Sequence, residues 1–130
     1  HVFSDVKRVA DALAAGHHLV LGVRSEKARV AEKIFGALMQ VCFGVKDPFC
    51  GLKGYHINLY RKNGVFDRLG STGTELMIQA LQGGYVPYQI NIHSAPRVNG
   101  TPRFGTAIRA NKRIFFSVIR VLPSLFSNCR

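Results

Sequence analysis

The sequence predicts an α/β fold, and three observations lead to that prediction. Apolar residues at helical spacing alternate along the chain with short apolar runs of the kind that form strands. Hydrophobic residues make up 47% of the 130 residues and charged residues 19%, which is the composition of a globular domain. Only about two strands are convincing, whereas a sheet commonly contains about five or six. We therefore expect an α/β domain that holds only part of its sheet.

A helix followed by a buried strand is expected at the start of the chain. Ser4 is a good N-cap, and Gly16 stands where a glycine would end the helix. Between them, one apolar face repeats at i, i+3, i+4 and i+7 and consists of Val6, Val9, Ala10 and Leu13. The apolar run over residues 19–23 then predicts a buried strand.

A second helix and a turn are expected next. Helical spacing recurs at Val30, Ile34, Ala37, Leu38 and Val41. Gly44 closes this helix, and Pro48 forces a turn over residues 47–51, because the residue before a proline avoids helical geometry. Residues 52–60 are expected to form a strand that runs into a short helix.

The remaining elements are expected to be a helix, a strand, a loop and a long helix. Residues 74–82 have helical spacing and end at two glycines, and residues 86–93 alternate apolar and polar as a half-buried strand does. A loop rich in proline, glycine and arginine covers residues 94–105. It leads to an apolar, basic helix over residues 107–122 that a proline ends.

The charge of the chain favours an anionic partner. Lys and Arg number 18 against 7 acidic residues, a net charge of +11, and Glu75 is the last acid. Nucleic acid, anionic lipid and a phosphorylated substrate all qualify. The phenylalanines are spread along the chain without the aromatic signature of an RNA-binding domain, so no specific nucleic acid is expected. The three cysteines lack metal-ligand spacing and are expected to be reduced thiols in a cytosolic protein.

Three segments carry residue types that could perform chemistry. Asp47 stands at a loop mouth, where it could act as a base, a metal-side ligand or an acceptor for a sugar hydroxyl; a simple turn cap is favoured on spacing alone. Glu75 lies in a first helical turn, where a dipole-matched cap is the favoured interpretation. Arg97 and Arg103 flank a loop with no acid nearby. We interpret them as anion-binding residues, because guanidinium groups bind phosphate oxygens bidentately.

In order and spacing, these segments resemble the C-terminal half of family 2 glycosyltransferases. The motifs that carry the resemblance are Gly22-x-Arg24 after a strand, Asp47 to Tyr55 (DPFCGLKGY), Gly73-Thr74-Glu75, Gly84-Tyr85 ahead of a strand, and Arg97-x-x-Gly100-x-Pro102-Arg103. The branch they resemble is that of the polyprenyl-phosphate sugar transferases, similar to dolichol-phosphate mannose synthase. The resemblance covers residues 1 to about 110. Pro102 departs from it, because the family often has Ser or Thr there.

The resemblance implies a GT-A fold, a Rossmann-like α/β sandwich. The implied activity is inverting sugar transfer from a nucleotide-sugar donor to a polyprenyl phosphate or another cell-envelope acceptor. Asp47 and Glu75 would be the catalytic residues, beside the acceptor and the transferred sugar. The phosphates of the donor or of the lipid would be bound by Arg24, Lys53, Arg97 and Arg103.

The resemblance also implies a divalent cation, Mg²⁺ or Mn²⁺. In the family this ion is held by a D-x-D motif that precedes the position of His1, together with the nucleotide-binding strands. This chain contains neither, so no metal ligand is assigned to it. We therefore expect an incomplete GT-A sandwich, and we expect the 130-residue chain alone to be inactive.

Two regions are expected. Residues 1–106 would be the C-terminal part of the glycosyltransferase domain, and residues 107–130 a basic amphipathic helix and tail. That helix suits an anionic membrane surface, with ordinary packing against the domain as the alternative. The expected location is cytoplasmic, peripheral at the inner face of the cytoplasmic membrane. The rival interpretation is a non-catalytic basic module that binds anionic membrane or nucleic acid.

Overall fold

The structure is a computed structural model of the chain, and it describes residues 2–25, 30–64, 66 and 73–93. Within these residues the elements follow in the order α1 (Phe3–Ala14), β1 (Leu19–Arg24), α2 (Val30–Phe43), β2 (Lys53–Tyr55), α3 (Ile57–Asn63), α4 (Thr74–Gln82) and β3 (Tyr88–Ile92). The expected loop over 94–105, the helix over 107–122 and the boundary at residue 106 lie outside the described residues.

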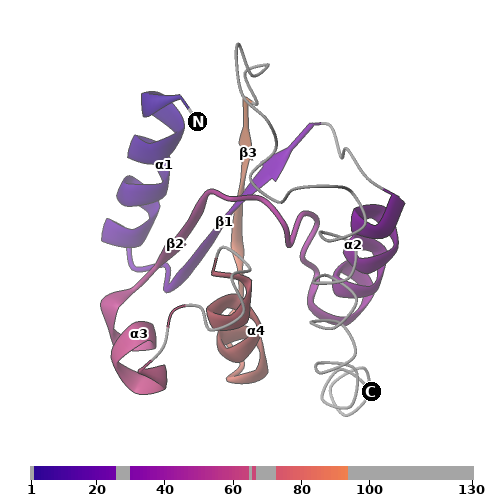
Figure 1. The fold of residues 1–130 in the computed structure, drawn as a ribbon. Helices are drawn as coiled ribbons and strands as arrows, with labels where there is room; N and C mark the ends of the chain where they lie inside the picture. Colours follow the sequence, from indigo (N-terminus) through magenta and orange to yellow (C-terminus); the bar gives the residue numbers. More distant parts are fainter. Residues whose placement is uncertain (1, 26–29, 65, 67–72, 94–130) are drawn as a thin grey trace.

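The three described strands form one mixed sheet in the order β2–β1–β3 (Figure 1). β1 and β3 run parallel, with Val20 opposite Tyr88 and Arg24 opposite Ile92, whereas β2 pairs antiparallel with the first half of β1. β1 is therefore the central strand, and burial from both faces explains its continuous apolar run. The parallel pairing also places the carboxyl ends of β1 and β3 at the same edge of the sheet.

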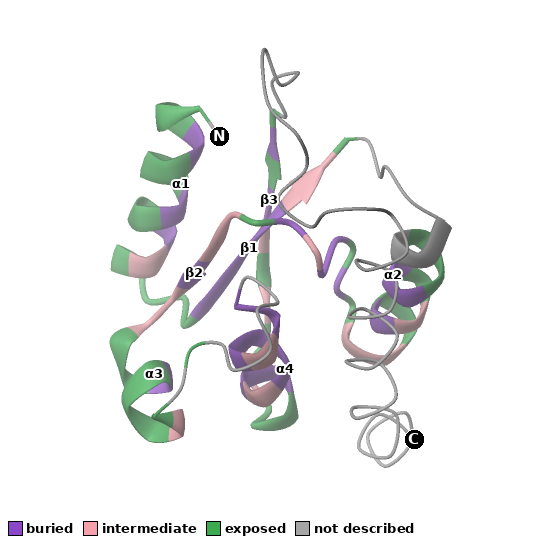
Figure 2. Cartoon of the chain, viewed as in Figure 1, coloured by how far each residue is buried: buried purple, intermediate pink, exposed green. Residues whose placement is uncertain are grey.

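Helices cover both faces of this sheet. α1 packs on one face, in a cluster that includes Val9, Val20 and Ile90. On the other face, Leu19 and Leu21 pack with residues of α2, α3 and α4 in a larger cluster. Figure 2 shows the buried residues of α1 and α4 on the sides turned toward the strands. The predicted α/β class is thus confirmed as a small α/β domain.

The contact between α1 and β2 requires a glycine. A Cβ atom at Gly54 would lie 2.5 Å from Cγ1 of Val9, closer than real Cβ atoms approach, and 3.0 Å from Cδ1 of Leu13, which is a tight contact. Gly54 is the middle residue of β2, so α1 can lie directly on the strand there. The glycine therefore sets how closely this helix approaches the sheet.

Most of the expected elements are present. The strand over 19–23, the helix closed by Gly44, the turn over 47–51, the strand–helix unit over 52–60 and the helix over 74–82 all appear. Other boundaries differ: α1 begins at Phe3 with Val2 at the N-cap, so the predicted cap at Ser4 is wrong. The N-cap of α4 is Gly73 in the left-handed region, with no side-chain cap.

The predicted apolar face is confirmed in part for α1, whereas in α2 most of the predicted residues are exposed. In α1, Val9 is buried and Leu13 half-buried as predicted, but Val6 is exposed, and Asp5 and Ala12 are buried instead. In α2 the described core residues include Phe35 and Met39, whereas Ile34 is 70% and Val41 83% exposed. Both helices carry apolar residues on adjacent stripes, and apolar spacing cannot decide which stripe meets the sheet. In α2 the larger side chains take the core position.

Two further expectations concern the cysteines and the membrane. Cys50 is a free, buried thiol, whereas Cys42 is disulfide-bonded, so the expectation of reduced thiols is wrong for Cys42. Among the described helices, none combines the length and the hydropathy that crossing a bilayer requires.

Candidate functional site

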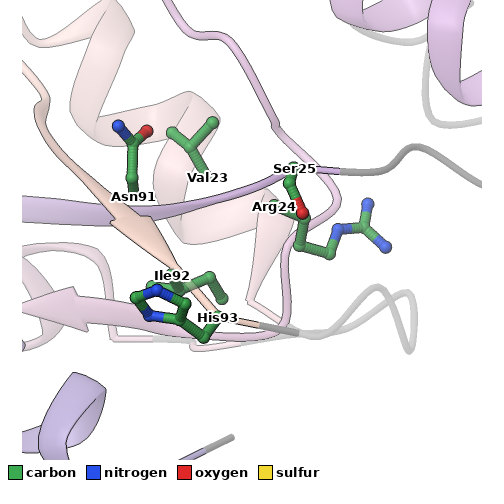
Figure 3. A pocket seen from close by; sticks show the side chains of 6 residues that line it. All are labelled: Val23, Arg24, Ser25, Asn91, Ile92 and His93. Carbon is green, nitrogen blue, oxygen red and sulfur yellow. The ribbon is translucent and has the colours of Figure 1, made fainter. Parts of the chain in front are cut away.

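A shallow hollow opens at the carboxyl ends of the parallel strands β1 and β3. Its volume is about 450 Å³, and its lining consists of Val23, Arg24, Ser25, Asn91, Ile92 and His93 (Figure 3). In open α/β sheets, ligands bind in the crevice outside the carboxyl ends of the strands. The hollow therefore lies where an α/β domain of this kind would bind a ligand.

Arg24, the last residue of β1, forms a bidentate ion pair with Asp47. Nε of Arg24 donates to Oδ2 at 2.7 Å, and Nη2 donates to Oδ1 at 2.9 Å. The backbone N–H of Arg24 also donates to Oδ2, at 3.1 Å. The Asp47 side chain is 2% exposed and that of Arg24 20%. Because a buried carboxylate needs partners, this pair fixes the guanidinium group at the mouth of the hollow.

The loop that carries Asp47 packs closely against β1. The backbone N–H of Gly22 donates to the carbonyl of Leu52 at 2.9 Å, and the N–H of Cys50 donates to the carbonyl of Asp47 at 3.4 Å. A Cβ atom at Gly22 would lie 2.9 Å from Sγ of Cys50 and 3.0 Å from that same carbonyl of Leu52. A glycine in β1 thus allows the loop to approach and bring Asp47 to the end of the strand.

Cys50 lies in the same loop, but it is not a reactive thiol. Burial raises the pKa of Cys50 above its ordinary value of 9.0, and the neighbouring Asp47 carboxylate raises it further. A hydrogen bond with the Leu52 backbone and the nearby cations Lys53 and Arg24 lower it in part. The thiolate is the nucleophilic form of cysteine, so this residue is suited to packing rather than to nucleophilic attack.

Lys53 links the loop to the start of α4. Its Nζ donates to the carbonyl of Cys50 at 2.6 Å and lies 3.5 Å from Oγ1 of Thr74, which is buried. The hydroxyl of Tyr55 donates to the carbonyl of Gly73 at 2.6 Å. Glu75, half-buried, follows in the first turn of α4, where a carboxylate is favourable toward the helix dipole. The segments around Asp47 and Glu75 are therefore held together by β2.

A second buried carboxylate holds the end of β3, and the sequence interpretation missed its role. Asp5 of α1 is 1% exposed, and its Oδ2 accepts the backbone N–H of His93 at 3.2 Å. Nη1 of Arg8 donates to Oδ1 of Asp5 at 3.3 Å and to the carbonyl of Asn91 at 2.8 Å. The sequence showed Asp5 only as an acid in a first helical turn. The contact between Asp5 and His93 joins residues far apart in the sequence, so the local sequence pattern could not predict it.

The described residues thus bring four of the six predicted site residues to one region of the molecule. These four are Arg24, Asp47, Lys53 and Glu75. Arg97 and Arg103 lie outside the described residues.

The described part of the chain offers no ligand set for the divalent cation that the resemblance implies. In residues 2–25, 30–64, 66 and 73–93, no group of three or more His, Cys, Asp or Glu side chains could hold a metal ion. Asp47 is already engaged by a guanidinium group on both oxygens. These residues therefore do not fit a metal centre.

Comparison with known proteins yields no relative: no family model, no curated protein and no solved structure matches this chain. The resemblance to family 2 glycosyltransferases therefore stays a prediction from the motifs.

Proposed function

We propose that this chain is the acceptor-side part of a family 2 glycosyltransferase with the GT-A fold. It would act in inverting transfer of a sugar from a nucleotide sugar to a polyprenyl phosphate or another cell-envelope acceptor. The observation that supports this most is the arrangement of three separate motifs around β1: Asp47 pairs with Arg24, and Lys53 of the same loop reaches Thr74, the neighbour of Glu75. The motifs of the sequence single out the same residues.

The charges in this region suit a phosphate-bearing substrate. The guanidinium group of Arg24 is held rigidly beside the hollow, and a fixed cation stabilises negative charge that builds on a departing nucleoside diphosphate. The loop with Arg97 and Arg103 follows β3 directly in the sequence, beginning one residue after His93. Under the proposal, cations from both parallel strands serve the same phosphate groups.

The two acidic residues would have different roles. Both oxygens of Asp47 accept hydrogen bonds from Arg24, and accepting a proton would break this pair, so we assign Asp47 to positioning Arg24. Glu75 is then the candidate for a general base, if the acceptor is a hydroxyl. A phosphate acceptor is already anionic and needs little help from a base. No step is assigned to a metal ion, because the described residues do not fit one.

Sugar transfer by the complete gene product tests the proposal. Extracted polyprenyl phosphate and a panel of radiolabelled nucleotide sugars would be incubated with wild-type protein, with Arg97→Ala and with Arg61→Ala. Arg61 is an exposed basic residue of α3 and makes a matched control for the loss of one charge. We expect transfer to be lost in Arg97→Ala and kept in Arg61→Ala.

Two outcomes would contradict the proposal. One is an Arg97→Ala variant as active as wild type, which would remove the assigned phosphate-binding role. The other is no transfer with any donor, together with binding to RNA or anionic vesicles that falls steeply with salt. The net charge of +11 would then favour the non-catalytic basic module.

A further inference from the structure

His93 occupies a position in the hollow that neither the motifs nor the proposed function explains. It is the first residue after β3 and it lines the hollow beside Arg24 and Ser25 (Figure 3). Its side chain is exposed. Its backbone, by contrast, is held by Asp5 through the hydrogen bond at 3.2 Å. The backbone of His93 is thus held in place, and its exposed imidazole extends from there into the hollow.

His93 is anchored by a part-buried ion pair at the end of the sheet, in which Asp5 is 1% and Arg8 49% exposed. Removing a carboxylate from water is costly unless hydrogen bonds compensate, and Asp5 obtains them from the His93 backbone and from Arg8. Arg8 in turn donates to the carbonyl of Asn91, two residues before His93. α1 therefore binds the end of β3 through two backbone groups, the carbonyl of Asn91 and the N–H of His93. These hydrogen bonds determine where the His93 backbone lies.

The polar groups around the hollow are suited to a negatively charged ligand. Of its six lining residues, none is acidic, and four have side chains that can donate hydrogen bonds: Arg24, Ser25, Asn91 and His93. Arg24 already donates to Asp47 through Nε and Nη2, so the hydroxyl, amide and imidazole groups of the other three are the donors that match the oxygens of a phosphate group. A volume of about 450 Å³ has room for one such group.

We propose that this hollow binds a phosphate group, that His93 contacts it, and that Asp5 is the residue that positions His93. The inference rests on the proposed function for the identity of the substrate, but its chemistry is that of any phosphate ester. The phosphate would come either from the diphosphate of a nucleotide sugar or from a lipid phosphate.

Calorimetric titration of the 130-residue chain with inorganic pyrophosphate tests the site directly. We expect His93→Ala to weaken pyrophosphate binding about tenfold or more, because a hydrogen bond to a charged group is lost. His93→Gln keeps a donor and should recover part of the affinity. Uridine diphosphate and farnesyl phosphate, titrated separately, show which of the two sources the site prefers.

Two variants of α1 test the positioning role. Asp5→Ala should weaken pyrophosphate binding and speed hydrogen exchange at the His93 amide, since its acceptor is gone. Asp5→Asn keeps an acceptor oxygen and should restore slow exchange. Asp11→Asn is the control, because it removes an exposed carboxylate from the same helix and should change neither quantity. Melting curves establish that each variant is folded.

The outcomes separate this inference from the proposed function. Absence of pyrophosphate binding to the wild-type chain, or equal affinity in wild type and His93→Ala, would overturn the phosphate site. An unchanged His93 amide in a folded Asp5→Ala variant would overturn the positioning role. A His93-dependent phosphate site in a protein that transfers no sugar would leave the inference standing and refute the glycosyltransferase proposal.

Discussion

Replacing Asp47 by asparagine removes one charge from the buried ion pair that joins β1 to the following loop. In the variant, Arg24 loses its counter-ion, and an amide N–H₂ group is brought toward a guanidinium group that also only donates. Breaking a buried pair from one side costs about 3–5 kcal/mol. Because Arg24 is 20% exposed, water recovers some of this loss, and we expect about 2–4 kcal/mol.

The chain contains a matched control for this experiment. Lys7 and Asp11 of α1 form an ion pair at the same distance, 2.7 Å, but their side chains are 64% and 62% exposed. Exposed ion pairs contribute under about 1 kcal/mol to the free energy of unfolding, so Asp11→Asn should change the stability of the chain little. The two variants carry the same substitution at the same ion-pair distance. The pairs differ in burial and in the number of hydrogen bonds, because Asp47 accepts three from Arg24 and Asp11 accepts one from Lys7.

Thermal unfolding followed by circular dichroism measures the difference. For a chain of this size, about 3 kcal/mol corresponds to a fall in Tm of roughly 10 °C, whereas Asp11→Asn should lower Tm by no more than about 3 °C. A double-mutant cycle with Arg24→Gln should give a coupling energy above about 1 kcal/mol. Equal Tm values for Asp47→Asn and Asp11→Asn, or a cycle without coupling, would show that this pair does not hold the loop to the strand.

Two further predictions concern packing. Gly54→Ala should destabilise the chain by about 1–3 kcal/mol, because its Cβ would meet Val9 in the α1–β2 contact; Gly44→Ala, where the added Cβ has open space, should cost only the strain of the left-handed backbone, about 1 kcal/mol. Chemical denaturation compares the two variants, and a cheaper Gly54→Ala would refute the close approach. Cys50 should react with a thiol reagent only after unfolding, because burial raises its pKa. Its contribution to the free energy of unfolding should be complete below pH 9.0 and decrease above it, as the unfolded thiol ionises first. Fast labelling of the folded chain at neutral pH would contradict both statements.

The sequence predicted the elements of the described region better than their packing. Apolar runs, glycines and Pro48 mark where β1, α2, α4 and the turn begin and end, because these signals act within a few residues. The predicted face was right for Val9 and Leu13 of α1 but wrong for Val6 of α1 and for Ile34 and Val41 of α2, since each helix offers two apolar stripes and the sheet selects one. The strand expected over residues 86–93 begins only at Tyr88, and Val86 lies outside it and is exposed.

For the candidate site as well, the sequence predicted the residues better than the contacts between them. Motif spacing singled out Asp47, Lys53 and Glu75, and it included Arg24, but it did not reveal that Arg24 and Asp47 pair with each other. Asp5 and His93 escaped notice because their contact joins the first helix to the end of the last described strand. The fold brings such distant partners together, and the residues next to them in the sequence give no signal of the contact.

The parallel pairing of β1 with β3 also has a consequence for folding kinetics. Val20 meets Tyr88, so this pairing must close a loop that spans most of the described chain, which costs entropy and slows the step. The hydrogen bond between Asp5 and the His93 backbone also requires that β3 has paired with β1. During synthesis the carboxyl edge of the sheet is therefore among the last regions to assemble. Chains released before β3 docks would have their helices but lack the hollow.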